Sequence, residues 1–381
     1  MSKVGIMLSM ICILSFYIIL NLYIGRKIFQ WIRLFFPYIN KAVYTVVYGF
    51  FALSLVIVFL PLPTIIKGTM SWISSYWMGI FIYLLIFFLI ADLIILLGRM
   101  TKIIPTPISQ SIHFYTGLSV ILLTAGVVSY GIYHANQIKY VSYDIHTKAT
   151  ALSTRMKIVL ISDLHLGAVN SEKRLENIVK NINNLEPDIV CIAGDIFNDD
   201  YYALQNPEKA IGLLKSITAT YGVYGSLGNH DSGKTFDEMI NFLKQSHIKL
   251  LNDTYVIIDG RLALFGRVDP SPIGGFGELK RKEITESIAS LDPKLPVVVM
   301  DHTPSNIEQY GENVDLVLAG HTHKGQIFPG SLITNAVFVV DYGHYQKDTV
   351  SPHVIVTSGV GTWGMPMRVG SNNEIVSINL R

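Results

Sequence analysis

The stretch "KIVLISD", residues 157–163, decides the fold of the second half of this chain. It is a short apolar run that ends in an aspartate, and such a run predicts a strand that is buried on both faces. The same arrangement, an apolar run followed by a polar residue, occurs again in "DIVCIAGD" (188–195), "GVYGSLGNHD" (222–231), "LALFGRVD" (262–269), "PVVVMDHTP" (296–304) and "DLVLAGHTH" (315–323). We therefore expect several buried strands with polar residues at their ends.

Segments with helical apolar spacing lie between several of these strands, at residues 172–184, 207–218, 235–246 and 280–290. Three further strands are expected in "VFVVDYGHY" (337–345), "HVIVTSG" (353–359) and "EIVSINL" (374–380). Strands that alternate with helices predict a layered α/β fold for this half of the chain.

The first third of the chain has a different character. The chain of 381 residues is 50% hydrophobic and 15% charged, with a mean hydropathy of +0.41, which is too apolar for an ordinary soluble enzyme. Four stretches of about 20 apolar residues could cross a bilayer, at residues 4–24, 42–60, 77–97 and 114–133. We expect residues 1–137 to form an all-α transmembrane domain of four helices and residues 138–381 to form the α/β domain.

Lysine and arginine in the expected loops indicate the orientation of these helices. The first and third loops contain Arg26, Lys27, Arg33, Lys41, Arg99 and Lys102, whereas the opposite side has Lys3, Lys67, Lys139 and Lys148. Because cytoplasmic loops are enriched in basic residues, this difference favours an extracytoplasmic α/β domain on a multi-pass protein of the cell membrane.

Several classes of function are disfavoured by the sequence. Asp92 is the one charged residue inside the four stretches; it lies near a helix end and Arg99, so we expect a local pairing, with a functional role as the alternative. A transporter would need more polar residues at midplane depth. A net charge of +2 without a basic stripe gives no sign of nucleic-acid binding. Cys12 and Cys191 lie in apolar runs and indicate neither a disulfide nor a zinc site.

Residues that can bind metals follow the expected strands. In chain order they are Asp163, His165, Asp195, Asn229, His230, His302, His321 and His323. The ends of parallel strands meet at one edge of an α/β sheet, so these side chains should converge. Aspartate and histidine together suit a transition metal, and there are enough ligands for two ions about 3.5–4 Å apart, as in two-metal hydrolases.

The ordered motifs "DLH", "GD", "GNHD", "H" and "GHTH" resemble those of the calcineurin-like metallophosphoesterase superfamily, over residues 143–381. The helical half followed by this domain, with the ending "SGVGTWGMPMRVG" (358–370), is similar to bacterial membrane-bound members. The resemblance implies a four-layer α/β/β/α sandwich and a metal-dependent phosphoric ester hydrolase.

The resemblance also implies roles for single residues. Asp163, His165 and His323 would hold one divalent ion, Asn229, His302 and His321 would hold a second, and Asp195 would bridge the two. Manganese is the first expectation, with iron, zinc or magnesium as alternatives. A hydroxide between the ions would attack phosphorus in line, and the unligated His230 would protonate the departing oxygen.

Two further residues are less well defined by the sequence. Arg368 could contact a substrate phosphate, with a structural role as the alternative. In some relatives an aspartate three places after the bridging aspartate orients the acid histidine. That position is Asn198 here, so Asp199 could take this role only if the loop permits it.

The sequence as a whole predicts a membrane-anchored phosphoesterase that acts on a phosphate ester. Because one helix suffices for tethering, four helices favour a lipid substrate at the membrane surface as a hypothesis. A nucleotide or pyrophosphate-bond hydrolase is the alternative within the enzyme class, and a membrane sensor without turnover is a second alternative. The sequence leaves open the choice between monoester and diester and the oligomeric state.

Overall fold

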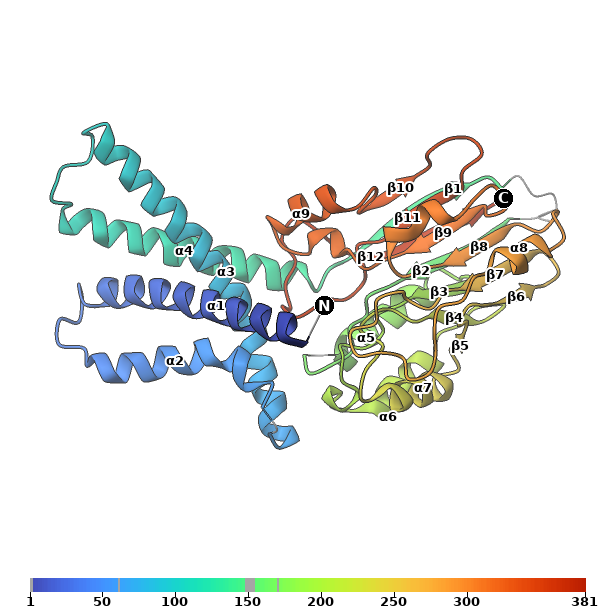
Figure 1. Cartoon of the computed structure of the whole chain (residues 1–381), viewed down its shortest axis with the longest axis horizontal. Helices are drawn as coiled ribbons and strands as arrows, with labels where there is room; N and C mark the ends of the chain where they lie inside the picture. The colour runs from blue at the N-terminus through green and yellow to red at the C-terminus, as the bar shows by residue number, and fades with distance from the viewer. Residues whose placement is uncertain (1–2, 61, 148–154, 170) are drawn as a thin grey trace. The chain divides into compact units, whose positions relative to one another are not determined.

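The computed structural model describes residues 3–60, 62–147, 155–169 and 171–381 of the chain. It divides into two compact units, Met1–Gly131 and Ile132–Arg381, which are taken in turn. Figure 1 shows the helices of the first unit in blue to cyan and the strands and helices of the second in green to red.

The first unit consists of helices α1 (Lys3–Ile32), α2 (Lys41–Ile57), α3 (Thr64–Met100) and α4 (Gln110–His134). Within the described residues, three stretches are long and apolar enough to cross a membrane: Met7–Ile32, Ile65–Met100 and Gln110–His134. Helix α2, with 17 residues, is at the short end of the range that can span a bilayer. Where the sequence predicted four spans, the described residues thus form three long apolar helices and one short apolar helix.

Helix α3 begins earlier than expected. Residues 64–76, which the sequence pattern placed in a loop, form its first turns. Pro63 ends the preceding segment and occupies the cap of α3, and from there to Trp77 the sequence contains no proline that would stop a helix.

The charge of Asp92 is satisfied inside the first unit. Its carboxylate accepts hydrogen bonds from Lys27 Nζ at 2.5 Å and from the Tyr23 hydroxyl at 2.7 Å, so both partners come from α1. Asp92 is paired, as expected, but its partners come from α1 and not from Arg99. This ion pair joins α1 to α3 and supports a structural role for Asp92.

The second unit contains two six-stranded sheets. The first sheet has the order β1-β12-β2-β3-β4-β5, with bounds Ile138–Ile145, Asn373–Leu380, Met156–Ile161, Ile189–Ala193, Val223–Ser226 and Lys249–Leu250. The second has the order β10-β11-β9-β8-β7-β6, with bounds Gly343–Tyr345, His353–Val356, Leu316–Ala319, Val297–Met300, Leu262–Gly266 and Thr254–Ile258. Strands β2 to β5 are mutually parallel, as are β7, β8, β9 and β11.

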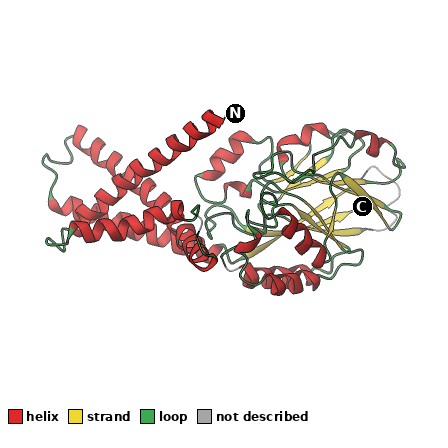
Figure 2. Cartoon of the chain, turned by 60° about the horizontal axis from the view of Figure 1, so that its bottom comes forward, coloured by secondary structure: helices red, strands yellow, loops and turns green. Residues whose placement is uncertain are grey.

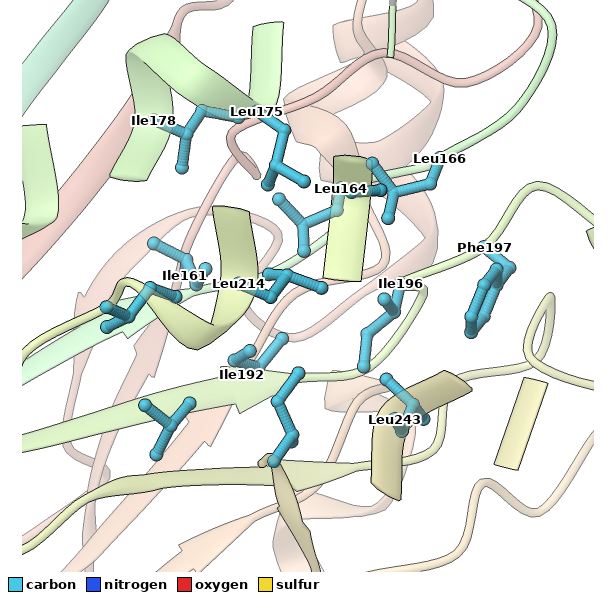
Figure 3. Close-up of a cluster of buried hydrophobic side chains, with 14 of the residues drawn as sticks. Ile161, Leu164, Leu166, Leu175, Ile178, Ile192, Ile196, Phe197, Leu214 and Leu243 are labelled. Atoms are coloured by element: carbon cyan, nitrogen blue, oxygen red, sulfur yellow. The ribbon is translucent and has the colours of Figure 1, made fainter. Parts of the chain in front are cut away.

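Strand β2 shows why the layers form. Val159 and Ile161 pack on helices α5 (Ser171–Asn183), α6 (Pro207–Lys215) and α7 (Phe236–Gln245), in the cluster that Figure 3 shows. Ile158 and Leu160 point the other way and pack against strands of the second sheet. Alternate side chains of a strand face opposite sides, so an apolar strand is buried between two layers.

The fourth layer covers the outer face of the second sheet. It contains α8 (Thr285–Ala289) and the 3₁₀ helix η2 (Pro304–Gln309), with Ile307 among its buried residues. Figure 2 shows the strands in yellow with red helices around them. The predicted four-layer α/β/β/α sandwich is therefore confirmed.

Two predicted elements differ from the structure. Residues 280–284 are not helical, because Arg281 pairs with Asp301 at 2.7 Å and the backbone N–H of Lys282 donates to Asp253. The expected strand at 337–345 is reduced to β10, and helix α9 (Gly330–Val337) precedes it. Short apolar runs fit a helix or a strand equally well, and Pro329 before Gly330 favours a helix start.

Candidate metal centre

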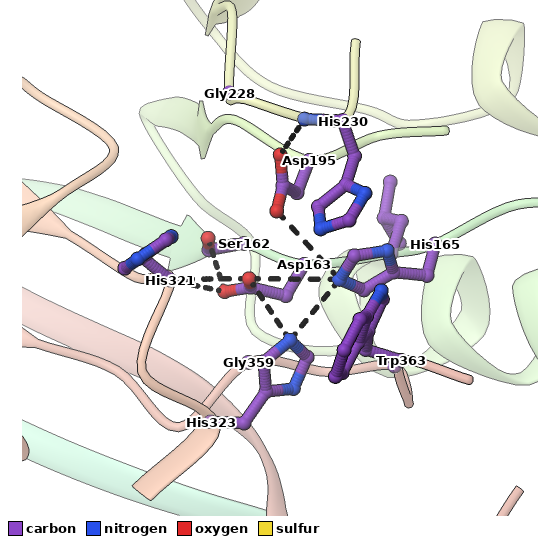
Figure 4. Close-up of polar contacts among 12 residues, drawn as sticks. Ser162, Asp163, His165, Asp195, Gly228, His230, His321, His323, Gly359 and Trp363 are labelled. Carbon is purple, nitrogen blue, oxygen red and sulfur yellow. Dashed lines mark hydrogen bonds and ion pairs between the residues drawn. The ribbon is translucent and has the colours of Figure 1, made fainter. Parts of the chain in front are cut away.

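The candidate metal ligands lie at the carboxyl ends of five strands from both sheets. Asp163 and His165 follow β2, Asp195 follows β3, and Asn229 follows β4. From the second sheet, His302 follows β8, and His321 and His323 follow β9. Figure 4 labels Asp163, His165 and Asp195 from the first sheet and His321 and His323 from the second, and their side chains point toward a common centre. The predicted residues therefore converge, as the strand-end pattern suggested.

Five of these residues have left-handed backbone conformations. The φ angles are 56° at Asp163, 45° at His165, 51° at Asp195, 72° at His321 and 50° at His323. Aspartate and histidine tolerate this region better than most residues, but it remains costly. Strained backbone of this kind concentrates at functional sites, where the surrounding structure holds the side chains in place.

Asp163, His165 and His323 form one group of potential ligands. His323 Nε2 lies 3.2 Å from Asp163 Oδ1 and 3.0 Å from His165 Nε2. All three side chains are buried, and their donor atoms lie within 4.8 Å of one another. Asp163 is held by the Ser162 hydroxyl, which donates to its Oδ2 at 2.6 Å.

Asp195, His302 and His321 form a second such group within the described residues. His302 Nε2 lies 3.0 Å from Asp195 Oδ2, and His321 Nδ1 lies 2.9 Å from the side-chain oxygen of Asn229. Asp195 Oδ2 also lies 3.7 Å from His165 of the first group. The carboxylate of Asp195 thus stands between the two groups, and His321 and His323 belong to different ones.

The donor atoms fit a divalent cation. The His302 Nδ1–H donates to the Ala193 carbonyl at 2.8 Å, so Nε2, which faces Asp195, is the nitrogen that could bind a cation. Nε2 is buried, and within the described part of the chain the buried His165 Nδ1 has no hydrogen-bond partner. His302 Nε2 and the Asp195 carboxylate, which face each other at 3.0 Å, need a positive charge between them, and either a proton on His302 or a bound cation supplies it. Carboxylate and imidazole donors suit manganese, iron or zinc.

The electrostatics of the cluster leave most of its ligands in their binding forms. His302 differs: burial would lower its pKa, but Asp195 raises it well above the usual value, so a cation at this site would replace a proton. Burial would raise the pKa of Asp163, but the imidazoles nearby, His323 first, hold it well below its usual range. Burial likewise would raise the pKa of Asp195, and His302 lowers it. Burial lowers the pKa of His165 and brings that of His321 to about 4, so both rings are neutral. Ionised carboxylates beside neutral imidazoles attract a cation.

His230 lies beside the two groups without joining either. Its Nδ1 is 2.7 Å from Asp199 Oδ1, and its backbone N–H donates to Asp195 Oδ1 at 2.9 Å. Burial would lower the pKa of His230, but the hydrogen bond to Asp199 raises it above the usual value. Asp199 reaches His230 with a φ of 67°, which places its carboxylate where Asn198 does not reach. The ring of Trp363 lies 5.7 Å from that of His230.

Arg368 does not face a substrate. Its side chain is fully buried, and its guanidinium donates to the carbonyls of Ser358 at 2.7 Å and His323 at 3.0 Å. One nitrogen also lies 3.2 Å from His323 Nδ1. Because carbonyls of the protein occupy these donors, the geometry supports the structural role that the sequence left as the alternative. Arg368 holds the chain around His323.

Other residues that hold the ligand loops were not assigned from the sequence. The buried Asp231 accepts hydrogen bonds from the backbone N–H groups of Phe197 at 2.8 Å and Gly228 at 2.9 Å, and so joins the loops after β3 and β4. Burial raises its pKa to about 7. Its position at the end of "GNHD" was the available signal.

Glycines allow the ligand loops to approach one another. A Cβ on Gly228 would lie 2.2 Å from Asp195 Oδ1, and one on Gly320 would lie 1.9 Å from the Ser162 hydroxyl. Gly194 has a φ of 79°, a backbone conformation that glycine adopts more readily than other residues. At Gly228 and Gly320 glycine is required because neighbouring atoms lie too close to leave room for a side chain.

Comparison with known proteins agrees with this geometry. Residues 156–325 match the model of the family described as calcineurin-like phosphoesterase. A protein of Aquifex aeolicus named "Uncharacterized metallophosphoesterase" is 30% identical over 240 residues, which are 63% of this chain and 90% of that protein.

Two other relatives extend the comparison. A Helicobacter pylori protein of the same name is 29% identical over 235 residues, and the match spans 60% of this chain and 60% of that protein. A "Transmembrane protein with metallophosphoesterase domain" of Danio rerio is 28% identical over 335 residues, 82% of this chain and 74% of that protein. The last match is long enough to include part of the helical unit.

Proposed function

This chain belongs to the calcineurin-like phosphoesterase family, and we propose that it is a membrane-anchored, metal-dependent hydrolase of phosphate esters. The observation that carries the proposal is the convergence of two ligand groups that meet at Asp195, with His230 beside them. A sensor without turnover would not need a histidine held next to the metal ligands by a carboxylate.

The ligands divide between two ions in this proposal. Asp163, His165 and His323 hold one, and Asn229, His302 and His321 hold the other. Asp195 is shared, which its position between His165 and His302 supports. When bound, two divalent cations, manganese by first expectation, activate water near neutral pH and neutralise charge on the phosphoryl group.

His230 supplies the proton in this proposal. Asp199 holds the Nδ1 side of the ring and favours the charged form, so the Nε2 proton is available for the departing ester oxygen. The backbone N–H of His230, bonded to Asp195, fixes the ring relative to the shared ligand.

The membrane part of the proposal follows from the helical unit. Residues 1–137 would form a multi-pass membrane domain and residues 138–381 an extracytoplasmic catalytic domain. Three long apolar helices support the membrane location, and the lysine and arginine distribution supports the side. A phosphorylated lipid is the substrate class that such a tether favours.

The test is hydrolysis by the full-length protein in detergent with manganese, on a nitrophenyl monoester and a bis-nitrophenyl diester. We expect turnover on at least one ester and a fall of at least about 100-fold in Asp195→Asn. The exposed Asp237→Asn on α7 is the matched control and should retain activity. Turnover that survives in Asp195→Asn would contradict the proposal, and two bound metals without turnover on any ester would favour the sensor.

A further inference from the structure

A segment of exposed apolar residues follows the loop that carries His321 and His323. Residues 327–340, here called the lip, contain helix α9 and carry no charged residue. Five large apolar side chains on the lip are exposed: Phe328, Leu332, Ile333, Val337 and Val339, at 52–69%. Soluble proteins rarely expose so many apolar side chains together, so this surface indicates a binding partner.

The lip is built onto the metal centre. The hydroxyl of Thr322, between His321 and His323, donates to the carbonyl of Asp341 at the end of the lip, at 2.6 Å. Thr334 of α9 donates to the carboxylate of the same Asp341 at 2.8 Å. The ring of Phe338 lies 5.9 Å from that of His321. The lip is thus fixed relative to the metal ligands, with its exposed residues beside the site.

The lip also begins beside the end of the last membrane helix. His134, the last residue of α4, contacts the carbonyl of Arg368 through Nδ1 at 3.3 Å. The next residue, Val369, accepts a hydrogen bond from the backbone N–H of Phe328 at 2.7 Å. These residues all belong to the second compact unit. The first residues of the lip therefore lie near the last residue of α4.

The connection between α4 and the first strand is short. Helix α4 ends at His134 and β1 begins at Ile138, and Asn373 beside β1 donates to the Ala135 carbonyl at 2.5 Å. Three intervening residues reach at most about 14 Å. Contacts within the second unit thus join the start of the lip to the residues that directly follow α4.

We propose that the lip enters the interfacial layer of the bilayer and presents the phosphate of a membrane lipid to the metal centre. An uncharged, apolar segment with an amphipathic helix suits this layer, where burying apolar area stabilises binding. The occupant of the lip is therefore bilayer lipid. The substrate part rests on the proposed phosphoesterase function, whereas insertion of the lip does not.

Insertion is tested with a fluorophore on the lip of the full-length protein in vesicles. Ile333→Cys is labelled in a Cys12→Ser background, since Cys191 is buried. We expect a blue-shifted emission that nitroxide-bearing lipids quench. The control is Ile257→Cys, an exposed isoleucine on β6, which should show neither effect. If nitroxide-bearing lipids do not quench the label at position 333, insertion is overturned. This holds whether the label is exposed to water or covered by protein.

Lipid delivery is tested with the triple variant Leu332→Ser, Ile333→Ser and Val337→Ser. Turnover of a phosphorylated lipid in vesicles should fall by at least about tenfold, while hydrolysis of the soluble nitrophenyl ester stays within about twofold. Ile257→Ser is the control. Equal loss on both substrates, or unchanged turnover in vesicles, would overturn delivery by the lip. Wild-type protein that hydrolyses neither substrate would refute the proposed function, and the fluorescence result would still decide insertion.

Discussion

Single residues of the site differ in how far sequence could predict them. The ligands could be found because each follows an apolar strand in a fixed order. Asp199 could not be assigned, because its role depends on a backbone φ of 67° that spacing does not reveal. The role of Arg368 stayed open because a sequence shows that a residue is cationic and near a motif, but not that it is buried among carbonyls.

At this scale, Asp199→Asn should impair proton donation without removing metals. The bond from His230 Nδ1 to Asp199 would weaken, so kcat for esters of poor leaving groups should fall by about 10- to 100-fold. A nitrophenyl ester, whose leaving group needs no proton, should be affected much less. Asp200→Asn, in the 3₁₀ turn beside it, is the control. Equal losses for both esters would show that Asp199 serves another purpose.

Arg368→Met should destabilise the protein and weaken metal binding. The substitution leaves the buried carbonyls of Ser358 and His323 without donors, which costs about 2–4 kcal/mol of unfolding free energy. Thermal unfolding and a metal titration measure both effects. If Arg368 bound substrate instead, KM would rise while stability and metal affinity stayed at the wild-type level.

The elements were predicted well where burial alone decided them. Strand β2 is apolar on both faces, so its position between two layers follows from its sequence. Residues 280–284 were assigned to a helix wrongly, because the Arg281 bond to Asp301 is a tertiary contact that no local pattern contains. The short run before β10 was ambiguous for the reason that short apolar runs always are.

The loop between β4 and Asn229 offers a test at the scale of elements. Gly228→Ala would place a methyl group against Asp195 Oδ1, so we expect loss of metal binding and of hydrolysis by at least about tenfold. Gly212→Ala, in helix α6, meets no atom within 4 Å and should leave activity unchanged, with equal or higher thermal stability. Normal metal content in Gly228→Ala would show that the loops bearing Asp195 and Asn229 can move apart without losing the metal ions.

The whole molecule combines a helical unit with a catalytic unit. The side of the membrane on which the catalytic unit lies can be tested. In a Cys12→Ser background, an impermeant maleimide added to intact cells should label Lys294→Cys in the catalytic unit. It should not label Ser109→Cys, in the third loop, until the cells are opened. The reverse pattern would place the catalytic unit in the cytoplasm.

The measurement that tests the central claim most directly is the metal content of purified full-length protein, taken together with hydrolysis as manganese is added. We expect about two ions per chain, with full turnover only at the second equivalent. His321→Ala and His323→Ala should each retain about one ion and lose turnover, because these histidines belong to different ligand groups. Full activity with a single bound ion, or a metal content that neither substitution changes, would contradict the account.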